Sequence, residues 1–289
     1  MPEAGLFGSA SVIAFGLVSA LAWGIADFGG GLASRRATLF GVVLVSQVAG
    51  LVVSIVLAVL SGEPWPAPVD LFWSALSGVI GAAAVLALYG GLAVGRMGVV
   101  APVAGVLGAS VPVLAGIVLE GLPQPIVLAG IGLAIVAVVL VSRVAGGPGA
   151  GRSGIELGVT AGICIGLFNV TISRVDESFV FGPVSIVRFV VIVVVVGAIV
   201  FARRPRTIPA RLLPVVAVIG VLDMIGVAAF LVAERTGPLA VASILSSLYP
   251  VTTVILAAIV LHERVTRHHA VGIAAAAVAI LMIGAGSVP

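Results

Sequence analysis

Long apolar stretches alternate with short segments rich in charge, Pro or Gly along the whole chain. An apolar helix of about 20 residues crosses the hydrocarbon core of a bilayer, so the pattern predicts membrane-spanning helices. A membrane β-barrel would need strands in which apolar and polar residues alternate, and stretches such as 189–201 (FVVIVVVVGAIVF) do not alternate. The ten predicted helices cover residues 11–31, 38–60, 71–93, 98–119, 125–143, 154–173, 183–202, 212–233, 239–261 and 269–286.

Composition points to the same class. Of the 289 residues, 61% are hydrophobic and only 9% are charged, and the mean hydropathy is +1.36. Soluble domains carry about 25% charged residues, so this chain cannot supply the charged surface of a soluble protein. We therefore predict an all-α, polytopic membrane protein. The first apolar run is longer than the core of a signal peptide and follows no basic segment, so we expect it to be retained.

The two halves of the chain resemble each other. Trp23-Gly24 aligns with Ile165-Gly166 and Gly78 with Gly220 at one constant offset, and Gly81 then aligns with Asp223. The fourth and ninth spans each end in an acid, Glu120 and Glu263. Because each half holds five spans, the second copy must enter the membrane in the opposite sense, which is an inverted repeat typical of secondary transporters. The predicted domains are 1–145, a Gly-rich linker at 146–153, and 154–289.

Arginine is unevenly distributed between the two sides of the predicted membrane domain. The chain has no lysine, and its formal net charge is +3. Arginine in short loops marks the cytoplasmic side, so we read the basic charge as a topology signal and expect no nucleic-acid partner. The opposite side holds only Arg174 and Arg235, which predicts that both termini lie outside the cytoplasm. The arginine-rich loops contain Arg35, Arg36, Arg96, Arg143, Arg152, Arg203, Arg204, Arg206, Arg211, Arg264 and Arg267.

Three ionisable residues fall inside predicted spans: Asp27, Arg188 and Asp223. Charge within a bilayer is costly and usually functional, so these residues are the candidate substrate-binding or coupling site, with Gln47 and Asn169 as polar companions. Each also has a structural interpretation. Arg188 could reach the headgroups instead of binding an anion or Asp223. Asp223 could be held by an arginine instead of contacting an amine or carrying a proton, and Asp27 could be an interfacial acid.

Prolines within spans are candidate kinks. Pro102 and Pro112 lie in the fourth predicted span and Pro250 in the ninth, and each removes a backbone hydrogen-bond donor. Kinks in corresponding spans of the two halves suit a gating element, although proline is common in membrane helices.

Cysteine and histidine offer little evidence for a metal or a disulfide. Cys164 is the single cysteine, and it lies in an apolar run where packing is the default role. His262, His268 and His269 share one loop region; a metal site there competes with simple solvation. We expect no cofactor and no metal. The alternative to a transporter is a membrane-embedded enzyme or a non-transporting scaffold. The sequence contains no recognisable nucleophile, metal or nucleotide motif, so we do not expect an enzyme.

Three segments carry recognisable motifs: residues 21–36 (LAWGIADFGGGLASRR), residues 187–189 (VRF), and residues 246–251 (SSLYPV) followed by 261–266 (LHERVT). With these motifs the chain resembles the EamA-type transporters of the drug/metabolite transporter superfamily. The first segment is similar to the opening helix of that family, the second to the second helix of one of its repeats, and the third to its closing signature. The first half departs, with Gly108 near the signature proline and residues 120–123 (EGLP) in place of Glu-Arg-Leu-Thr.

The resemblance implies ten helices in two inverted repeats around a central cavity. It also implies transport of small polar or amphipathic metabolites, amino-acid-like solutes among them, often by export and often linked to protons. The expected location is the inner membrane of the cell, with the lipid bilayer and a small-molecule substrate as partners. The resemblance places the termini in the cytoplasm, which is opposite to the orientation that the arginine distribution predicts. The oligomeric state is left open.

Overall fold

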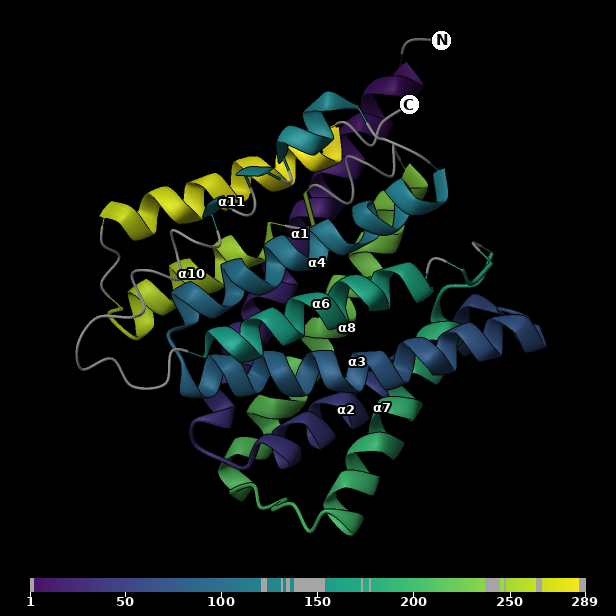
Figure 1. The fold of residues 1–289 in the computed structure, drawn as a ribbon. Helices are drawn as coiled ribbons and strands as arrows, with labels where there is room; N and C mark the ends of the chain where they lie inside the picture. Colours follow the sequence, from purple (N-terminus) through teal and green to yellow (C-terminus); the bar gives the residue numbers. More distant parts are fainter. Residues whose placement is uncertain are drawn as a thin grey trace.

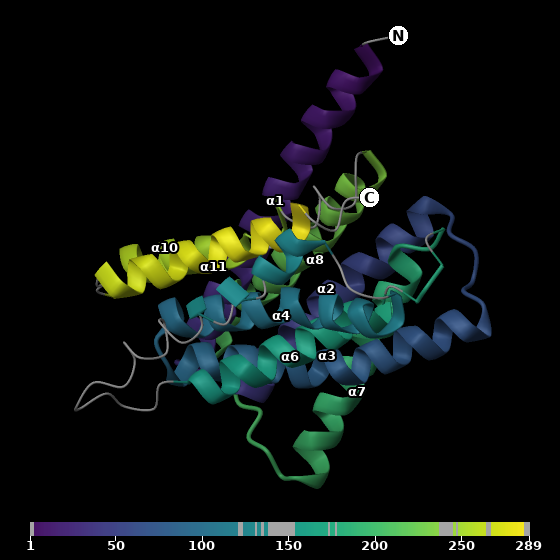
Figure 2. The same ribbon diagram turned by 45° about the horizontal axis from the view of Figure 1, so that its top comes forward.

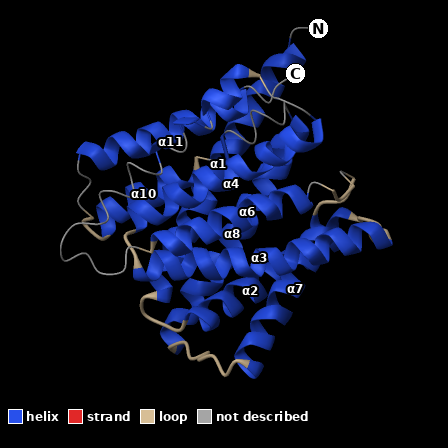
Figure 3. Ribbon diagram, in the orientation of Figure 1, coloured by secondary structure: helices blue, strands red, loops and turns tan. Residues whose placement is uncertain are grey.

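A computed structural model shows the described part of the chain to be helical, with no strand among those residues (Figures 1 and 3). The six helices that are long and apolar enough to cross a membrane support the prediction of an all-α, multi-pass membrane protein. The structure describes residues 3–120, 124–130, 132–133, 136–137, 154–172, 174–176, 178–236, 245–246, 248–263 and 267–285.

The first four predicted spans correspond to four helices of the first half. The first helix is longer than its predicted span, 11–31, and the boundaries of the other three lie within three residues of the predicted ones. The fifth predicted span, 125–143, is helical at 125–130, and most of its remainder lies outside the described residues. The helices are α1 (Glu3–Ser34), α2 (Leu39–Ser61), α3 (Pro68–Val94) and α4 (Met97–Glu120).

The second half follows the predicted spans except in the ninth. That span, 239–261, is helical at 245–246 and again in α10, which begins at Tyr249 after a turn at Leu248; residues 239–244 and 247 lie outside the described residues. Pro250 lies in the first turn of α10, where its missing N–H leaves no bond unmade. The elements are α6 (Ile155–Ile172), α7 (Phe181–Phe201), the 3₁₀ turn η1 (Ala210–Leu212), α8 (Leu213–Thr236), α10 (Tyr249–Val260) and α11 (Arg267–Ala285).

Large apolar side chains cover the outer faces of the helices. Leu60 is 77% exposed and Phe201 is 89% exposed, and Val52 and Phe189 are more than half exposed. Water would make such a surface unfavourable, whereas lipid hydrocarbon solvates it. The distribution is therefore that of a protein whose outer surface faces a bilayer.

Helices from the two halves pack against one another. α1 lies along α8, α2 along α7, and α3 along α6, so the hydrophobic core is shared between the halves. In both ribbon views α10 and α11 lie at one margin of the bundle and α7 at the opposite margin (Figures 1 and 2). Small residues permit these close approaches in lipid. A Cβ added to Gly78 of α3, for example, would lie 2.9 Å from the carbonyl oxygen of Val187 in α7.

The described loops gather at two ends of the bundle. At the arginine-rich end, the Thr38 hydroxyl donates to the carbonyl of Thr207, 2.9 Å away, joining the α1–α2 and α7–α8 loops. At the opposite end, the segment after α2 contacts the α6–α7 loop, where Glu63 accepts hydrogen bonds from the backbone of residues 180–182. This division is what successive membrane crossings produce.

Candidate functional site

An ion pair joins α7 and α8 near the middle of both helices. Nη2 of Arg188 donates to Oδ2 of Asp223 across 2.5 Å, and Nη1 donates to Oε1 of Gln47 on α2 across 3.2 Å. Arg188 is 4% exposed, because it shares the buried face of α7 with Val187 and Val191. Three of the predicted site residues are therefore in direct contact. Of the alternatives for Arg188, the structure shows the partner of Asp223 and not the headgroup contact.

A glycine of α2 makes room for the Arg188 guanidinium. A Cβ added to Gly50 would lie 2.8 Å from Cζ of Arg188, which is closer than atoms can approach without a shift. Nε of Arg188 is buried and has no hydrogen-bond partner. The network thus holds the arginine firmly while leaving its Nε donor without a partner.

Asp27 lies near the ion pair but is not part of it. It is partly exposed on α1, and its carboxylate makes no hydrogen bond or ion pair in the described structure. Asp223 on α8 and the phenols of Tyr89 and Tyr249 are within electrostatic range of its charge. Asp27 is therefore an acid in a membrane helix with acidic and phenolic neighbours and no counterion of its own.

Aromatic side chains surround the same part of α1. Trp23, one turn before Asp27, meets Tyr249 of α10 edge to face with ring centroids 6.5 Å apart, and Phe230 of α8 at 5.9 Å. The ring of Tyr89 from α3 lies directly against Gly30, where an added Cβ would come within 2.6 Å of Cε1. The acid and the aromatic rings thus share one region among α1, α3, α8 and α10.

The remaining predicted residues lie elsewhere. Asn169 is exposed on α6 and makes no contact with the ion pair. Pro102 lies in α4, which continues past it without interruption, as it does past Pro112. Pro102 and Pro250 line one small cavity together with residues of α11. Two of the three prolines therefore meet where α4, α10 and α11 come together.

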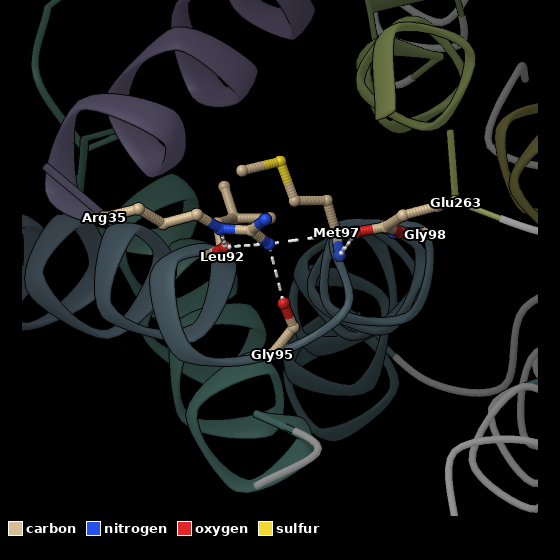
Figure 4. Close-up of polar contacts among 6 residues, drawn as sticks. All are labelled: Arg35, Leu92, Gly95, Met97, Gly98 and Glu263. Atoms are coloured by element: carbon tan, nitrogen blue, oxygen red, sulfur yellow. Dashed lines mark hydrogen bonds and ion pairs between the residues drawn. The ribbon is translucent and has the colours of Figure 1, made fainter. Parts of the chain in front are cut away.

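A polar network closes the arginine-rich end between α1, α4 and the residues after α10 (Figure 4). The Glu263 carboxylate accepts hydrogen bonds from the backbone N–H groups of Met97 and Gly98, at 3.2 and 3.1 Å. Those groups open α4, and a carboxylate is favourable at a helix N-terminus. His262, with φ of 53°, turns the chain so that Glu263 reaches them.

Arg35 extends this network to α3. Its guanidinium donates to the carbonyl of Leu92 at 3.0 and 3.2 Å and to that of Gly95 at 2.8 Å, and it lies 3.8 Å from the Glu263 carboxylate (Figure 4). The end of α1 is thereby fastened to the α3–α4 turn. We call Arg35 and Glu263, with the backbone groups they bind, the arginine-end latch.

A second carboxylate network closes the opposite end. Both oxygens of Glu63 accept hydrogen bonds from the N–H groups that open α7, at 2.9 to 3.1 Å. Asp70, at the start of α3, accepts from the backbone N–H of Asp176, 3.0 Å away. In the same loop, hydrogen bonds from the hydroxyl and N–H of Ser178 lower the pKa of the Asp176 carboxyl. We call the contacts of Glu63 and Asp70 the opposite-end latch.

The arginine-rich end also carries a recess. It has a volume of about 580 Å³ and is lined by Arg36, Arg211 and Leu212, which bring together the end of α1 and the start of α8. Two guanidinium groups make this recess electropositive. Within the described residues, no group of three or more His, Cys, Asp or Glu side chains could hold a metal ion.

The sequence model of the EamA-like transporter family matches residues 152–285. Residues 152–285 belong to the EamA-like transporter family. The match covers α6, α7, α8, α10 and α11, and thus includes both members of the ion pair. The sequence matched none of the curated proteins with which it was compared.

The fold extends the likeness beyond the EamA-like segment. Sixteen chains of solved structures match it. One, described as "Crystal structure of protein", is 16% identical, with a TM-score of 0.65; the alignment covers 94% of this chain and 98% of that chain. At this level of identity the likeness concerns the fold alone.

Several residues of this site were missed in the sequence. Gly50 is one of many glycines, and only the position of Arg188 gives it a role. Tyr89 lies in an apolar span, where the sequence gives no reason to distinguish a tyrosine from the other buried residues. Glu63 stands in a Pro-rich loop with no helical partner in its own segment, so no spacing rule could have found it. Tyr249 was noticed only as part of a family signature, and Trp23 only in such a signature and in the alignment of the two halves.

Proposed function

We propose that this protein is a secondary active transporter that moves small polar or amphipathic solutes across the inner membrane by alternating access. The observation that carries the proposal is the hydrogen-bonded ion pair of Arg188 and Asp223, with Gln47, buried at the junction of α2, α7 and α8. Buried charge in a membrane protein is costly and commonly marks a pathway for substrate or ions. The family resemblance is the basis for three further parts of the proposal: that transport is export, that it is linked to protons, and that the solutes include amino-acid-like molecules.

An inverted repeat of two five-helix halves is part of the proposal, and paired glycine contacts support it. Gly78 brings α3 against Val190 of α7, while Gly220, its sequence counterpart, brings α8 against Ser46 of α2. If the two halves are exchanged, the third span takes the place of the eighth and the seventh that of the second. The contact of α3 with α7 then becomes the contact of α8 with α2. Pseudo-two-fold symmetry of this kind lets one half rock against the other.

A second pair of glycines obeys the same exchange. Gly24 of α1 meets Thr252 of α10, in the ninth predicted span, and Gly166 of α6 meets Val111 of α4. If the halves are exchanged, the first span takes the place of the sixth and the ninth that of the fourth. The contact of α1 with α10 then becomes the contact of α6 with α4. Two independent contacts related by one operation favour a common repeat over chance similarity of apolar sequences.

The two latches fit alternating access because they join moving parts at opposite ends. The arginine-end latch joins α1 and the residues after α10 to the α3–α4 turn, and the opposite-end latch joins the α2–α3 loop to the start of α7. Each uses backbone N–H groups and a carboxylate, so each can open without leaving an unpaired charge in the hydrocarbon core. In the proposed cycle, one latch opens while the other holds.

The proposed function is tested with purified protein in liposomes. Liposomes are loaded with pools of amino acids, amines, sugars and organic acids, and efflux is followed with and without an imposed pH gradient. The proposal expects at least one class to leave protein-containing liposomes faster than protein-free ones, and the pH gradient to change its rate. Efflux equal to that of protein-free liposomes for every class would contradict it.

A further inference from the structure

The charges around Asp27 do not balance within the described structure. The Asp27 carboxylate lies within electrostatic range of the Asp223 carboxylate, and the Arg188 guanidinium is paired with Asp223. Arg188 is committed to Asp223 and Gln47, so the unpaired negative charge belongs to Asp27. An ionised carboxylate in a membrane helix is costly unless a cation accompanies it.

The surroundings of Asp27 are of the kind that binds organic cations. Tyr89 and Tyr249 lie within electrostatic range of its carboxylate, and Trp23 stands one turn before it on α1 against Tyr249. Aromatic faces attract cations through their quadrupole. The Tyr249 hydroxyl is buried and has no hydrogen-bond partner, so it is available to donate a hydrogen bond to a bound molecule or to accept one from it.

We infer that Asp27 binds a small organic monocation, such as a protonated amine, held against the rings of Trp23, Tyr89 and Tyr249. The inference rests on the proposed transport function and names its substrate class. A free anion is disfavoured because the buried guanidinium of Arg188 already has a carboxylate partner. A neutral solute would make no use of the Asp27 charge, because the carboxylate would keep its proton while that solute was bound.

A proton and an organic cation are alternatives at this carboxylate. When the organic cation is absent, a proton on Asp27 gives the same charge balance, so binding of the cation releases one proton. The groups that face Asp27 are Asp223 on α8, Tyr89 on α3 and Tyr249 on α10, with Arg188 on α7 beyond Asp223. This exchange is one means by which a pH gradient could drive transport.

The inference is tested by binding to the purified full-length chain in detergent. Phenethylammonium and tetraethylammonium are the cationic probes, and phenethyl alcohol is the neutral probe of matched shape. Asp27→Asn removes the charge, Asp27→Glu retains it, and Glu156→Gln removes an exposed acid at the start of α6 as a control. Calorimetric titration in two buffers of different ionisation enthalpy gives both the affinity and the number of protons released.

We expect at least one cation to bind the wild type more tightly than phenethyl alcohol does, with proton release. Asp27→Asn should weaken that binding by roughly tenfold or more, as expected for loss of a charged contact. It should also abolish proton release. Asp27→Glu should retain measurable binding and Glu156→Gln should match the wild type. Trp23→Leu should weaken cation binding several-fold while leaving the proton release per bound cation unchanged.

The inference is overturned if neither cation binds the wild type better than phenethyl alcohol, or if Asp27→Asn binds the cations as the wild type does. Proton titration of Asp27 without binding of either cation also overturns it, because Asp27 would then serve protons only. These outcomes are separate from failure of the proposed function. A wild type that moves other solutes in liposomes but binds no cation leaves the transporter proposal standing.

Discussion

Arg188 and Asp223 form an ion pair between α7 and α8, two helices that each pack against α2, with Nη2 and Oδ2 2.5 Å apart. The arginine side chain is 5% exposed and the aspartate side chain 30% exposed, so the pair is protected from solvent mainly at its basic member. Gln47 fixes the second guanidinium nitrogen from α2. The three helices are therefore joined through one side chain.

The first prediction is that the ion pair behaves as a unit. Asp223→Asn leaves the buried Arg188 charge without its partner and should destabilise the protein by about 3–5 kcal/mol. The double variant Arg188→Met with Asp223→Asn removes both charges and should lose less than either single variant. Unfolding in mixed micelles measures each difference. A loss in the double variant equal to the sum of the single losses would show that the two side chains do not interact.

The second prediction concerns the space that Gly50 leaves for Arg188. Gly50→Ala places a methyl group where the guanidinium lies and should cost about 1–3 kcal/mol, as overpacking does. Gly197→Ala is the matched control, because no atom lies within 4 Å of an added Cβ there. Thermal unfolding in detergent compares the two. Equal midpoints for the two variants would mean that Gly50 does not shape the arginine site.

The third prediction is that Glu263 holds the arginine-rich end closed. Glu263→Gln removes the charge that binds the N-terminus of α4, and hydrogen bonds to charged groups contribute about 1.5–3 kcal/mol. Val100 is fully buried in the same part of α4, so a cysteine there reports opening of this end. In a background with Cys164→Ala, Val100→Cys should react with a soluble thiol reagent roughly tenfold faster when Glu263 is Gln. An unchanged reaction rate would show that Glu263 does not hold the arginine-rich end closed.

The fourth prediction is the orientation in the membrane. The arginine distribution predicts that the loops containing Arg36 and Arg211 face the cytoplasm, whereas the family resemblance implies the opposite. With Cys164 replaced by alanine, Arg36→Cys and Ser61→Cys occupy exposed positions at opposite ends of the bundle. An impermeant thiol reagent added to intact cells should label Ser61→Cys and spare Arg36→Cys. The reverse pattern would establish the orientation of the family.

The sequence predicted the helical class and most helix positions because membrane spans leave a strong local signal of length and hydrophobicity. It did not predict the turn at Leu248 within the ninth span, because apolar residues continue through that turn. Hydrophobicity cannot distinguish one long helix from two short ones, and Pro250 marked the place without giving the boundary.

The candidate site was predictable only in part. Charge within a span identified Arg188 and Asp223, and their pairing was one of the alternatives that the sequence left open. The contributions of Gly50 and Glu63 depend on contacts between segments distant in the chain, which no local pattern encodes. Asn169 was predicted as a polar companion of the charged residues, but the face of α6 that carries it is exposed. Polarity within a predicted span did not by itself place a residue at the site.

The central claim is that solute transport passes through the buried Arg188 network. Liposomes containing wild type, Arg188→Ala, Arg188→Lys or Arg174→Ala are compared for efflux of a solute that the wild type transports. Arg174 is exposed in the α6–α7 loop, so its variant removes the same charge without touching the network. The account predicts wild-type efflux for Arg174→Ala and none for Arg188→Ala. It also predicts weak efflux for Arg188→Lys, because lysine cannot reproduce the fork that binds Asp223 and Gln47. Wild-type efflux from Arg188→Ala liposomes at equal protein content would contradict the claim.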